Sequence, residues 1–223
     1  MARRTNTRIQ KPHLILCEGA DAENFLIAWL NNPLLSHHPI FSNDIQVMDF
    51  GGIADLPRFL KVIQSMEGYS TAASILVMRD AERDAEAAIR EVCAALKRAK
   101  LPVPAKPRQW EDGRGPKTGF LLFPSCNDSP RNGTLEDLCL DILSDESRAE
   151  LLEEIQRFMD LLHKKNHREF PHAFKTKLHT YFSITDAFVS MKIGEAARAG
   201  AFNWGHEKLR PMQDFLLELV PAQ

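Results

Sequence analysis

The sequence has few cysteines and no long apolar run, and each of these absences excludes a class of protein. Its four cysteines, Cys17, Cys93, Cys126 and Cys139, form no C-x-x-C pair, which argues against a zinc ribbon or a redox dithiol. We expect free thiols in a reducing compartment. No stretch of the sequence approaches the roughly 20 apolar residues of a membrane helix, and the apolar run near the basic N-terminus is too short for a signal peptide. We therefore expect a cytoplasmic protein that makes no contact with a membrane.

The sequence also lacks a charge imbalance, because its net charge is −2 over 223 residues. No global positive field draws the chain to nucleic acid, so any polyanion must bind to a local patch. Residues 97–117 and 157–179 are the two basic segments that could form such a patch. They either hold phosphate groups or are solvated helix faces, and the sequence leaves both interpretations open.

Apolar runs alternate with amphipathic segments in the first half of the chain. The runs that predict strands are 13–17, 44–50, 74–78 and 119–124. The segments with helical spacing are 21–31, 54–66 and 82–100. Three successive strand–helix pairs and a fourth strand favour a Rossmann-like α/β fold, with a mostly parallel four-stranded sheet flanked by helices. The proline- and glycine-rich residues 101–119 predict a loop.

The pattern becomes helical in the second half. Residues 133–143 begin with Thr134 as a predicted N-cap and Asp137 at the third position after it. A long amphipathic helix is predicted over 148–165, and 170–220 is mostly helical in pattern. We expect an α/β domain over 1–124 and a helical C-terminal elaboration over 125–223. The elaboration should pack on the domain because no obvious linker separates them.

Acidic residues follow two of the predicted strands at the point where each strand ends. Glu18 ends the first strand, and Asp80 and Glu82 follow the third. Parallel strands present their carboxyl ends at one edge of the sheet, where ligands bind. Carboxylates that meet there repel one another, and a divalent cation relieves that repulsion. Mg²⁺ prefers oxygen ligands and commonly keeps waters, so the pattern predicts a Mg²⁺ (or Mn²⁺) site for phosphate chemistry.

A second interpretation is that Glu18 and Asp80 cap the helices that follow them, where acids are favoured by the helix dipole and the free N–H groups. One acid alone would fit that interpretation well. Two acids at equivalent strand ends, with Gly19 available for a tight turn, favour the metal site. A receiver-like phosphoacceptor centred on Asp80 would need adjacent acids at the end of the first strand, and Glu18 alone matches that poorly.

The segments "LILCEG" and "ILVMRDAERD" together resemble the TOPRIM domain of topoisomerases, primases and OLD-family nucleases, over about residues 12–124. That family has a Glu-Gly after its first strand and a D-x-D after a later one, which together bind Mg²⁺. The resemblance implies metal binding by Glu18, Asp80 and Glu82, although this chain has D-x-E. It is nearest to small stand-alone bacterial TOPRIM-like proteins and, through them, to OLD-type nuclease domains.

Further acids extend the implied ligand set. OLD-type nucleases use an acid from a later segment for a second metal, and "GTLEDLCL" offers Glu136 and Asp137 for that role. We also count Asp84, which follows Glu82 closely, among the candidate ligands. Relatives often carry another acid four residues after the first Glu, and Ala22 stands there in this chain, between Asp21 and Glu23.

Two functional hypotheses follow from the acids and the resemblance. The first is metal-dependent phosphodiester cleavage of nucleic acid, in which Glu18, Asp80 and Glu82 hold the metal. Lys117, or else Lys175 or Lys177, would neutralise charge on the phosphate. The second is a non-catalytic binding or regulatory module that keeps the TOPRIM-like fold, in a defence or DNA-processing system. An ATPase is a candidate partner protein under either hypothesis.

Overall fold

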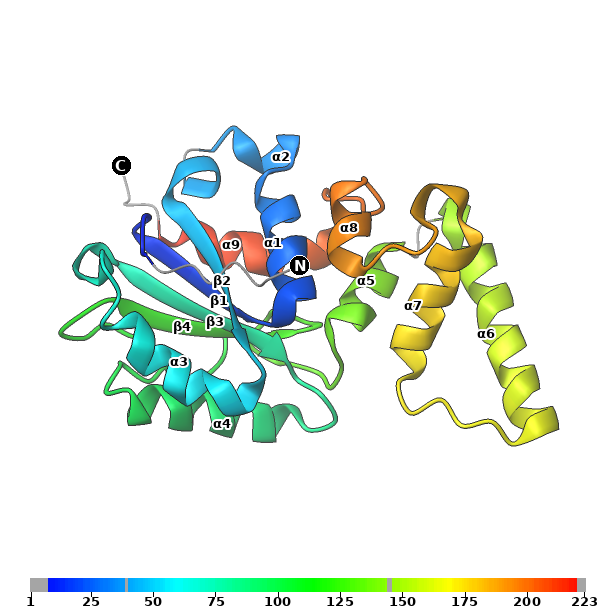
Figure 1. Ribbon diagram of the computed structural model, residues 1–223, viewed down its shortest axis with the longest axis horizontal. Coiled ribbons are helices and arrows are strands. Elements are labelled where there is room, and N and C mark those ends of the chain that lie inside the picture. The colour runs from blue at the N-terminus through cyan, green and yellow to red at the C-terminus, as the bar shows by residue number, and fades with distance from the viewer. Residues whose placement is uncertain (1–7, 39, 144–145, 220–223) are drawn as a thin grey trace.

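The computed structural model describes residues 8–38, 40–143 and 146–219, so the first seven residues of the predicted α/β domain lie outside it. Four parallel strands form one sheet in the order β2-β1-β3-β4 (Figure 1). Their bounds are β1 His13–Glu18, β2 Ile45–Gly51, β3 Ser74–Asp80 and β4 Lys117–Phe123. The predicted Rossmann-like α/β fold is therefore confirmed.

Helices cover both faces of the sheet, which explains why its strands read as continuous apolar runs. The first-half helices are α1 Gly19–Leu30, α2 Pro33–Ser36, α3 Leu56–Ile63 and α4 Ala85–Arg98. Alternate residues of each strand enter two separate cores. Leu14, Leu16 and Val77 pack with α3 and α4, whereas Ile15, Cys17 and Met78 pack with α1 and the C-terminal helices. All four cysteines have free thiols, as predicted.

The C-terminal half supplies much of the second face. Its helices are α5 Leu135–Leu143, α6 Glu146–Asn166, α7 Ala173–Ile184, α8 Ile193–Arg198 and α9 Arg210–Leu217. Phe215 of α9 stacks on Trp110 at 4.5 Å between ring centroids, and α8 packs on α1. Helices α6 and α7 instead project from the body as an antiparallel pair (Figure 1).

The predicted loop after α4 lies along the free edge of β4. The N–H of Arg108 donates to the carbonyl of Phe120, and Glu111 and Thr118 exchange two backbone hydrogen bonds. The loop therefore covers an edge that could otherwise pair with another chain. It ends earlier than predicted, because β4 begins at Lys117.

The described ranges contain no helix that is both long and apolar enough to span a membrane.

Candidate metal centre

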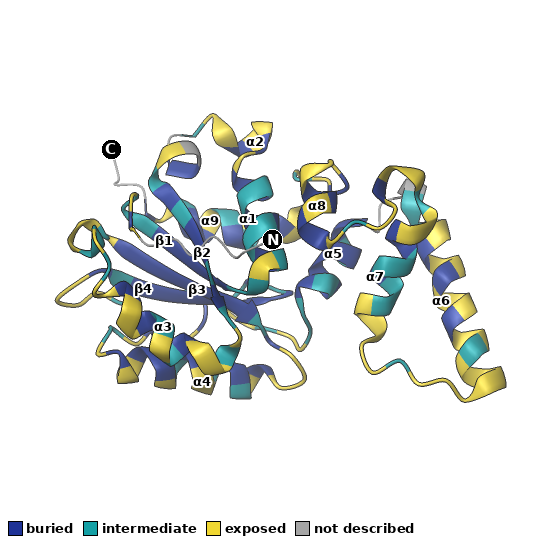
Figure 2. Ribbon diagram, viewed as in Figure 1, coloured by how far each residue is buried: buried dark blue, intermediate teal, exposed yellow. Residues whose placement is uncertain are grey.

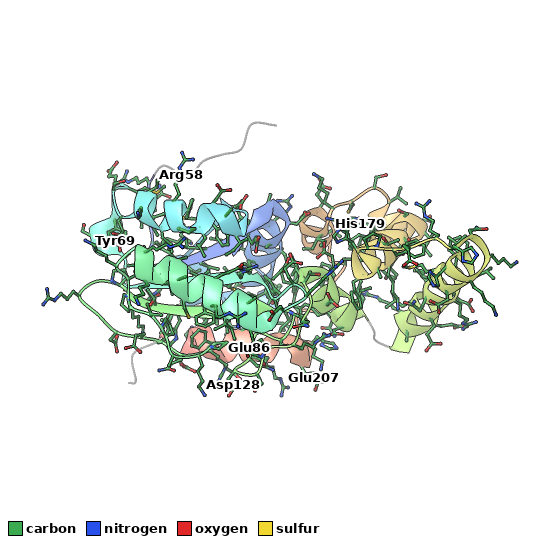
Figure 3. The ribbon with its side chains drawn as sticks, turned by 90° about the horizontal axis from the view of Figure 1, so that it is seen from below. Arg58, Tyr69, Glu86, Asp128, His179 and Glu207 are labelled. Atoms are coloured by element: carbon green, nitrogen blue, oxygen red, sulfur yellow. The ribbon has the colours of Figure 1, made fainter. Side chains whose placement is uncertain are left out.

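The carboxyl edge of the sheet brings the predicted acids together. Strands β1 and β3 are neighbours, and Cys17 pairs with Met78, so Glu18 lies beside Arg79 and Asp80. Figure 3 shows this edge between the start of α4, which Glu86 marks, and α7, which carries His179. The adjacency of two strands that are separated by β2 in the sequence is what creates the cluster.

Glu18 holds its carboxylate inward through two contacts. Its Oε1 accepts a hydrogen bond of 3.0 Å from the backbone N–H of Ile53. Its Oε2 lies 3.4 Å from Nε of Arg79, but both atoms are buried and neither makes a hydrogen bond. Burial raises the pKa of the Glu18 carboxyl, and the charge of Arg79 opposes that rise. Glu18 thus keeps one carboxylate oxygen with an unmet hydrogen-bonding capacity.

Arg79 is a part of the site that the sequence reasoning missed. Its side chain is only 4% exposed, and its Nη1 donates a hydrogen bond to Glu91 of α4. A buried guanidinium is expensive unless it is paired, and here Glu18 and Glu91 supply the negative charge. The signal was present in the sequence, as a lone charge between the apolar run "SILVM" and Asp80.

Asp49 is a second residue that the sequence reasoning missed. Its Oδ1 accepts hydrogen bonds from the N–H of Gly19 at 2.9 Å and from that of Gly51 at 2.6 Å. Gly19 has a φ of +86°, a left-handed conformation that favours glycine. The carboxylate of Asp49 therefore fixes the turn that directly follows Glu18.

Asp80 lies deepest among the acids. Its Oδ1 accepts a hydrogen bond of 2.8 Å from the N–H of Leu135, at the start of α5. Burial and the nearby charge of Glu136 raise the pKa of Asp80 to about 8, with smaller contributions from Glu18 and Glu82. The Asp80 carboxyl is therefore largely protonated at neutral pH, and a bound cation would favour its ionised form.

Glu82 is held in an uncommon backbone conformation. Its φ is +55°, in the left-handed region that few non-glycine residues adopt. Its N–H donates to the carbonyl of Gly133 at 2.8 Å, and the N–H of Gly133 donates back at 2.7 Å. This pair of bonds fastens the loop after β3 to the segment before α5. The C-terminal half of the chain thus positions Glu82, the last residue of the D-x-E motif.

Glu136 and Lys175 complete the edge. Glu136 follows Leu135 in the first turn of α5, and its side chain is 14% exposed. Nζ of Lys175, on α7, lies 3.7 Å from Oε1 of Glu136. Of the three lysines that were candidates for charge neutralisation, Lys175 has an ion pair with an acid of the cluster.

The helix-capping interpretation is wrong for Asp80, because Asp84 is the N-cap of α4, whereas Glu18 does occupy the N-cap position of α1. Glu18 makes no side-chain hydrogen bond to α1, and the Asp80 carboxylate binds the start of α5 instead of α4. Helix α5 begins at Leu135, directly after Thr134, as predicted. The Asp137 carboxylate accepts hydrogen bonds from the N–H and the hydroxyl of Thr134. The carboxylates of both strand-end acids therefore contact segments other than the helix that follows each strand.

Two predicted site residues lie elsewhere or have another role. Asp84 is the N-cap of α4, where its carboxylate accepts a hydrogen bond from the N–H of Ala87, and its side chain is 60% exposed. Lys117 begins β4 opposite Ser74, at the amino edge of the sheet. That position is six residues, or roughly 20 Å, from the end of the strand that faces Asp80. The charge of Lys117 lies over the ring of Trp110, 5.4 Å from its centroid, and cannot serve the acidic edge.

The two basic segments also differ in position. Residues 97–117 return the chain to the amino edge at the start of β4, although Lys106 lies 3.7 Å from Asp128 beyond the end of that strand. Residues 157–179 approach the acids, through Lys175 and through a hydrogen bond from Arg83 to the carbonyl of Pro171. Of the two basic segments, only 157–179, which includes part of α7, is therefore placed to hold phosphate groups near the acids.

The described residues include no set of three or more His, Cys, Asp or Glu side chains that could hold a metal ion in their present positions. The chemistry of the donors nevertheless fits a hard divalent cation, because all four acids offer oxygen ligands. The buried Oε2 of Glu18, which has no hydrogen bond, is the specific feature that a cation would satisfy. The acids converge at one edge, and side-chain rotation is needed to complete a coordination shell.

The comparison with known proteins identifies the family of this chain and nothing further. No curated protein and no solved structure matches it. A family model matches residues 12–221, which include all four strands and the acidic edge. The chain belongs to the family described as "Protein of unknown function (DUF3226)".

Proposed function

We propose that the carboxyl edge of the sheet binds Mg²⁺ or Mn²⁺ and cleaves phosphodiester bonds in nucleic acid, as in a TOPRIM-like nuclease. The observation that carries this proposal is the meeting of Glu18, Asp80, Glu82 and Glu136 at that edge. Strand adjacency brings the first two together. The Asp80–Leu135 and Glu82–Gly133 hydrogen bonds bring the segment before Glu136 to the same place.

The cost of this arrangement supports a functional role. Burial disfavours the charged form of Asp80, the like charge of Glu136 adds to that effect, and together they raise the pKa of Asp80. The positive φ of Glu82 adds about 1–3 kcal/mol of backbone strain. Perturbed acids and strained backbone concentrate at active sites. A chain that used these residues only for packing would be more stable with neutral side chains there.

Each residue has a distinct role in the proposal. Glu18, Asp80 and Glu82 supply carboxylate oxygens, and Glu136 extends the set on the α5 side. A divalent ion would stabilise negative charge on the phosphate and supply the nucleophile. Lys175 is placed to neutralise a phosphate oxygen when it leaves Glu136, since the two lie 3.7 Å apart. The charge of Arg79, 3.4 Å from Oε2 of Glu18, favours the ionised form of that carboxylate.

Cleavage of supercoiled DNA and of a structured RNA in millimolar Mn²⁺ tests the proposal. We expect slow cleavage by the wild type and none by Glu18→Gln or Asp80→Asn. Glu111→Gln removes a carboxylate from a residue whose backbone pairs with Thr118, next to the start of β4, and should leave cleavage unchanged. Equal rates for all four proteins would indicate a contaminating nuclease and would contradict the proposal.

A non-catalytic binding or regulatory module is the second candidate, and one observation favours it. Arg79 already opposes the charge of Glu18, so the site is neutralised in part without a cation. Glu82→Asp, which restores the D-x-D of the TOPRIM family, separates the two candidates. Cleavage by Glu82→Asp alone, with an inactive wild type, would identify the natural protein as a module that has lost catalysis. Cleavage by both proteins supports the nuclease.

A further inference from the structure

One side of α6 carries a stripe of exposed apolar side chains. Leu151, Phe158 and Leu161 are 37%, 55% and 44% exposed. With Glu154 and Lys165 they recur at alternating steps of three and four residues, the spacing that aligns side chains along one side of a helix in a coiled coil. We call these five residues the α6 stripe.

The α6 stripe is separate from the part of α6 that stabilises the fold. Leu152, Ile155 and Met159 are each 4% exposed, and they join the main core on the side of α6 that packs on α7. Helix α6 is the outermost element of the projecting pair, with its outer side exposed (Figures 1 and 2). A helix needs only one apolar face to pack on its neighbour, so the second apolar face has no role within the monomer.

The charges of the stripe identify what could cover it. Glu154 lies one turn before Phe158, and Lys165 lies one turn after Leu161. If a second α6 lies antiparallel across a two-fold axis, Phe158 of each copy meets Leu161 of the other. Glu154 of each copy then meets Lys165 of the other. The stripe is therefore complementary to its own antiparallel image, which is the requirement for an isologous two-fold interface.

The charges of Glu154 and Lys165 can both reach a second copy of the chain. Glu154 forms an ion pair of 2.7 Å with Arg157, but both side chains are more than half exposed, and exposed pairs of this kind contribute little stability. Lys165 has no ion pair with any residue in the described ranges. Both can turn toward a second copy at small cost.

We infer that two copies of the chain associate through the α6 stripe as an antiparallel helix pair, with a Phe158–Leu161 centre flanked by Glu154–Lys165 contacts. This inference does not depend on the proposed nuclease activity. A second copy is favoured over an unrelated partner because the stripe supplies both halves of the charge pattern.

Sedimentation analysis of the full chain over a range of concentrations tests the association. We expect a reversible dimer for the wild type. Phe158→Asp should weaken dimerisation by about 30-fold or more, as loss of a central aromatic anchor does. Leu34→Asp is the matched control, because Leu34 is 56% exposed on α2, on the main body, and its loss should leave dimerisation unchanged. A monomer at all concentrations, or a dimer that Phe158→Asp leaves intact, would overturn the inference.

A charge-exchange experiment tests the antiparallel register. Glu154→Lys places Lys opposite Lys in a homodimer, and Lys165→Glu places Glu opposite Glu, so each variant alone should dimerise weakly. A mixture of the two variants restores an opposite-charge contact at both ends, and we expect heterodimers at near wild-type affinity. The double variant should also dimerise like the wild type. Weak association in the mixture and in the double variant would overturn the register, and unchanged circular dichroism spectra of the single variants serve as the control for folding.

Discussion

The charged residues at the amino edge of the central sheet, where the strands begin, differ in environment from those at the carboxyl edge, where the strands end. At the amino edge, Nδ1 of His13 lies 2.9 Å from the hydroxyl of Ser74, and Lys117 lies over the ring of Trp110. Burial lowers the pKa of His13, which keeps the ring neutral near pH 7. At the carboxyl edge, burial and the charges of Glu136, Glu18 and Glu82 together raise the pKa of Asp80.

The difference between the edges indicates which of them has a function to serve. Polar groups at the amino edge have ordinary partners of the kind that satisfy any buried polar atom. The carboxyl edge instead gathers like charges, leaves Glu18 Oε2 without a hydrogen bond and holds Glu82 at positive φ. Selection for stability alone would remove such features. Four experiments test this contrast.

The first prediction is a loss of cation binding at the carboxyl edge. We expect Asp80→Asn to lower the affinity for Mn²⁺ by about 100-fold, since loss of even an outer-shell partner costs 10–100-fold. Asp44→Asn, which removes an acid that acts on His13 at the amino edge, should leave the affinity unchanged. Titration of free Mn²⁺ by electron paramagnetic resonance measures both. Equal affinities for the two variants would erase the distinction between the edges.

The next effect concerns the buried guanidinium. Arg79→Met removes the positive charge between Glu18 and Glu91, and it should lower the free energy of unfolding by about 3–5 kcal/mol because it leaves Glu18 unpaired. Adding Glu18→Gln to Arg79→Met should recover part of that loss. Urea unfolding at pH 7 measures the variants. A double variant no more stable than Arg79→Met would show that Arg79 acts by packing rather than by charge.

The third prediction is a pH dependence of stability that originates in Asp80. The folded-state pKa of Asp80 is about 8, against 3.8 in the unfolded chain. The folded state therefore binds more protons between these values, so this contribution to stability is complete below pH 4, decreases as the pH rises, and levels off above pH 8.

Asp80→Asn should remove that contribution, so the variant should gain stability relative to the wild type as the pH rises from 5 to 8. The limiting slope of that gain is about 1.4 kcal/mol per pH unit. Urea unfolding of both proteins at several pH values measures it, and the comparison cancels the titration of histidines. Millimolar Mn²⁺ should reduce the pH dependence of the wild type, because the cation replaces the proton. A constant difference between the two proteins would contradict the assigned pKa.

The sequence predicted the fold more completely than the site, for physical reasons. Apolar runs and helical spacing are local signals, so the strands and helices could be identified with small errors at their ends. The order β2-β1-β3-β4 places Glu18 beside Asp80, and this strand order was not predicted from the sequence. Lys117 was assigned to the wrong edge because a strand's direction decides which of its ends faces the site, and Lys117 is at the beginning of β4.

The missed residues depended on contacts between distant segments. Arg79 looked like the end of an apolar run, and only the packing of α4 shows its pairing with Glu91. Asp49 lies 30 residues along the chain from Gly19, whose N–H donates a hydrogen bond to the Asp49 carboxylate. Asp84 has the right residue type and is near the motif, but local geometry makes it a helix cap. Residue type and spacing suggest candidates, and the tertiary contacts decide among them.

The smallest effect separates backbone strain from charge at Glu82. Glu82→Ala and Glu82→Gly both remove the carboxylate, so both should weaken Mn²⁺ binding to the same extent. They differ in the cost of a φ of +55°, which alanine bears and glycine does not. Glycine also gains freedom in the unfolded chain, which opposes the relief of strain by about 0.4–1 kcal/mol. We therefore expect Glu82→Gly to be more stable than Glu82→Ala by about 0.5–1 kcal/mol, measured by urea unfolding without metal. If alanine is the more stable of the two, the backbone at Glu82 is unstrained, and the cost of the carboxyl edge lies in its charges alone.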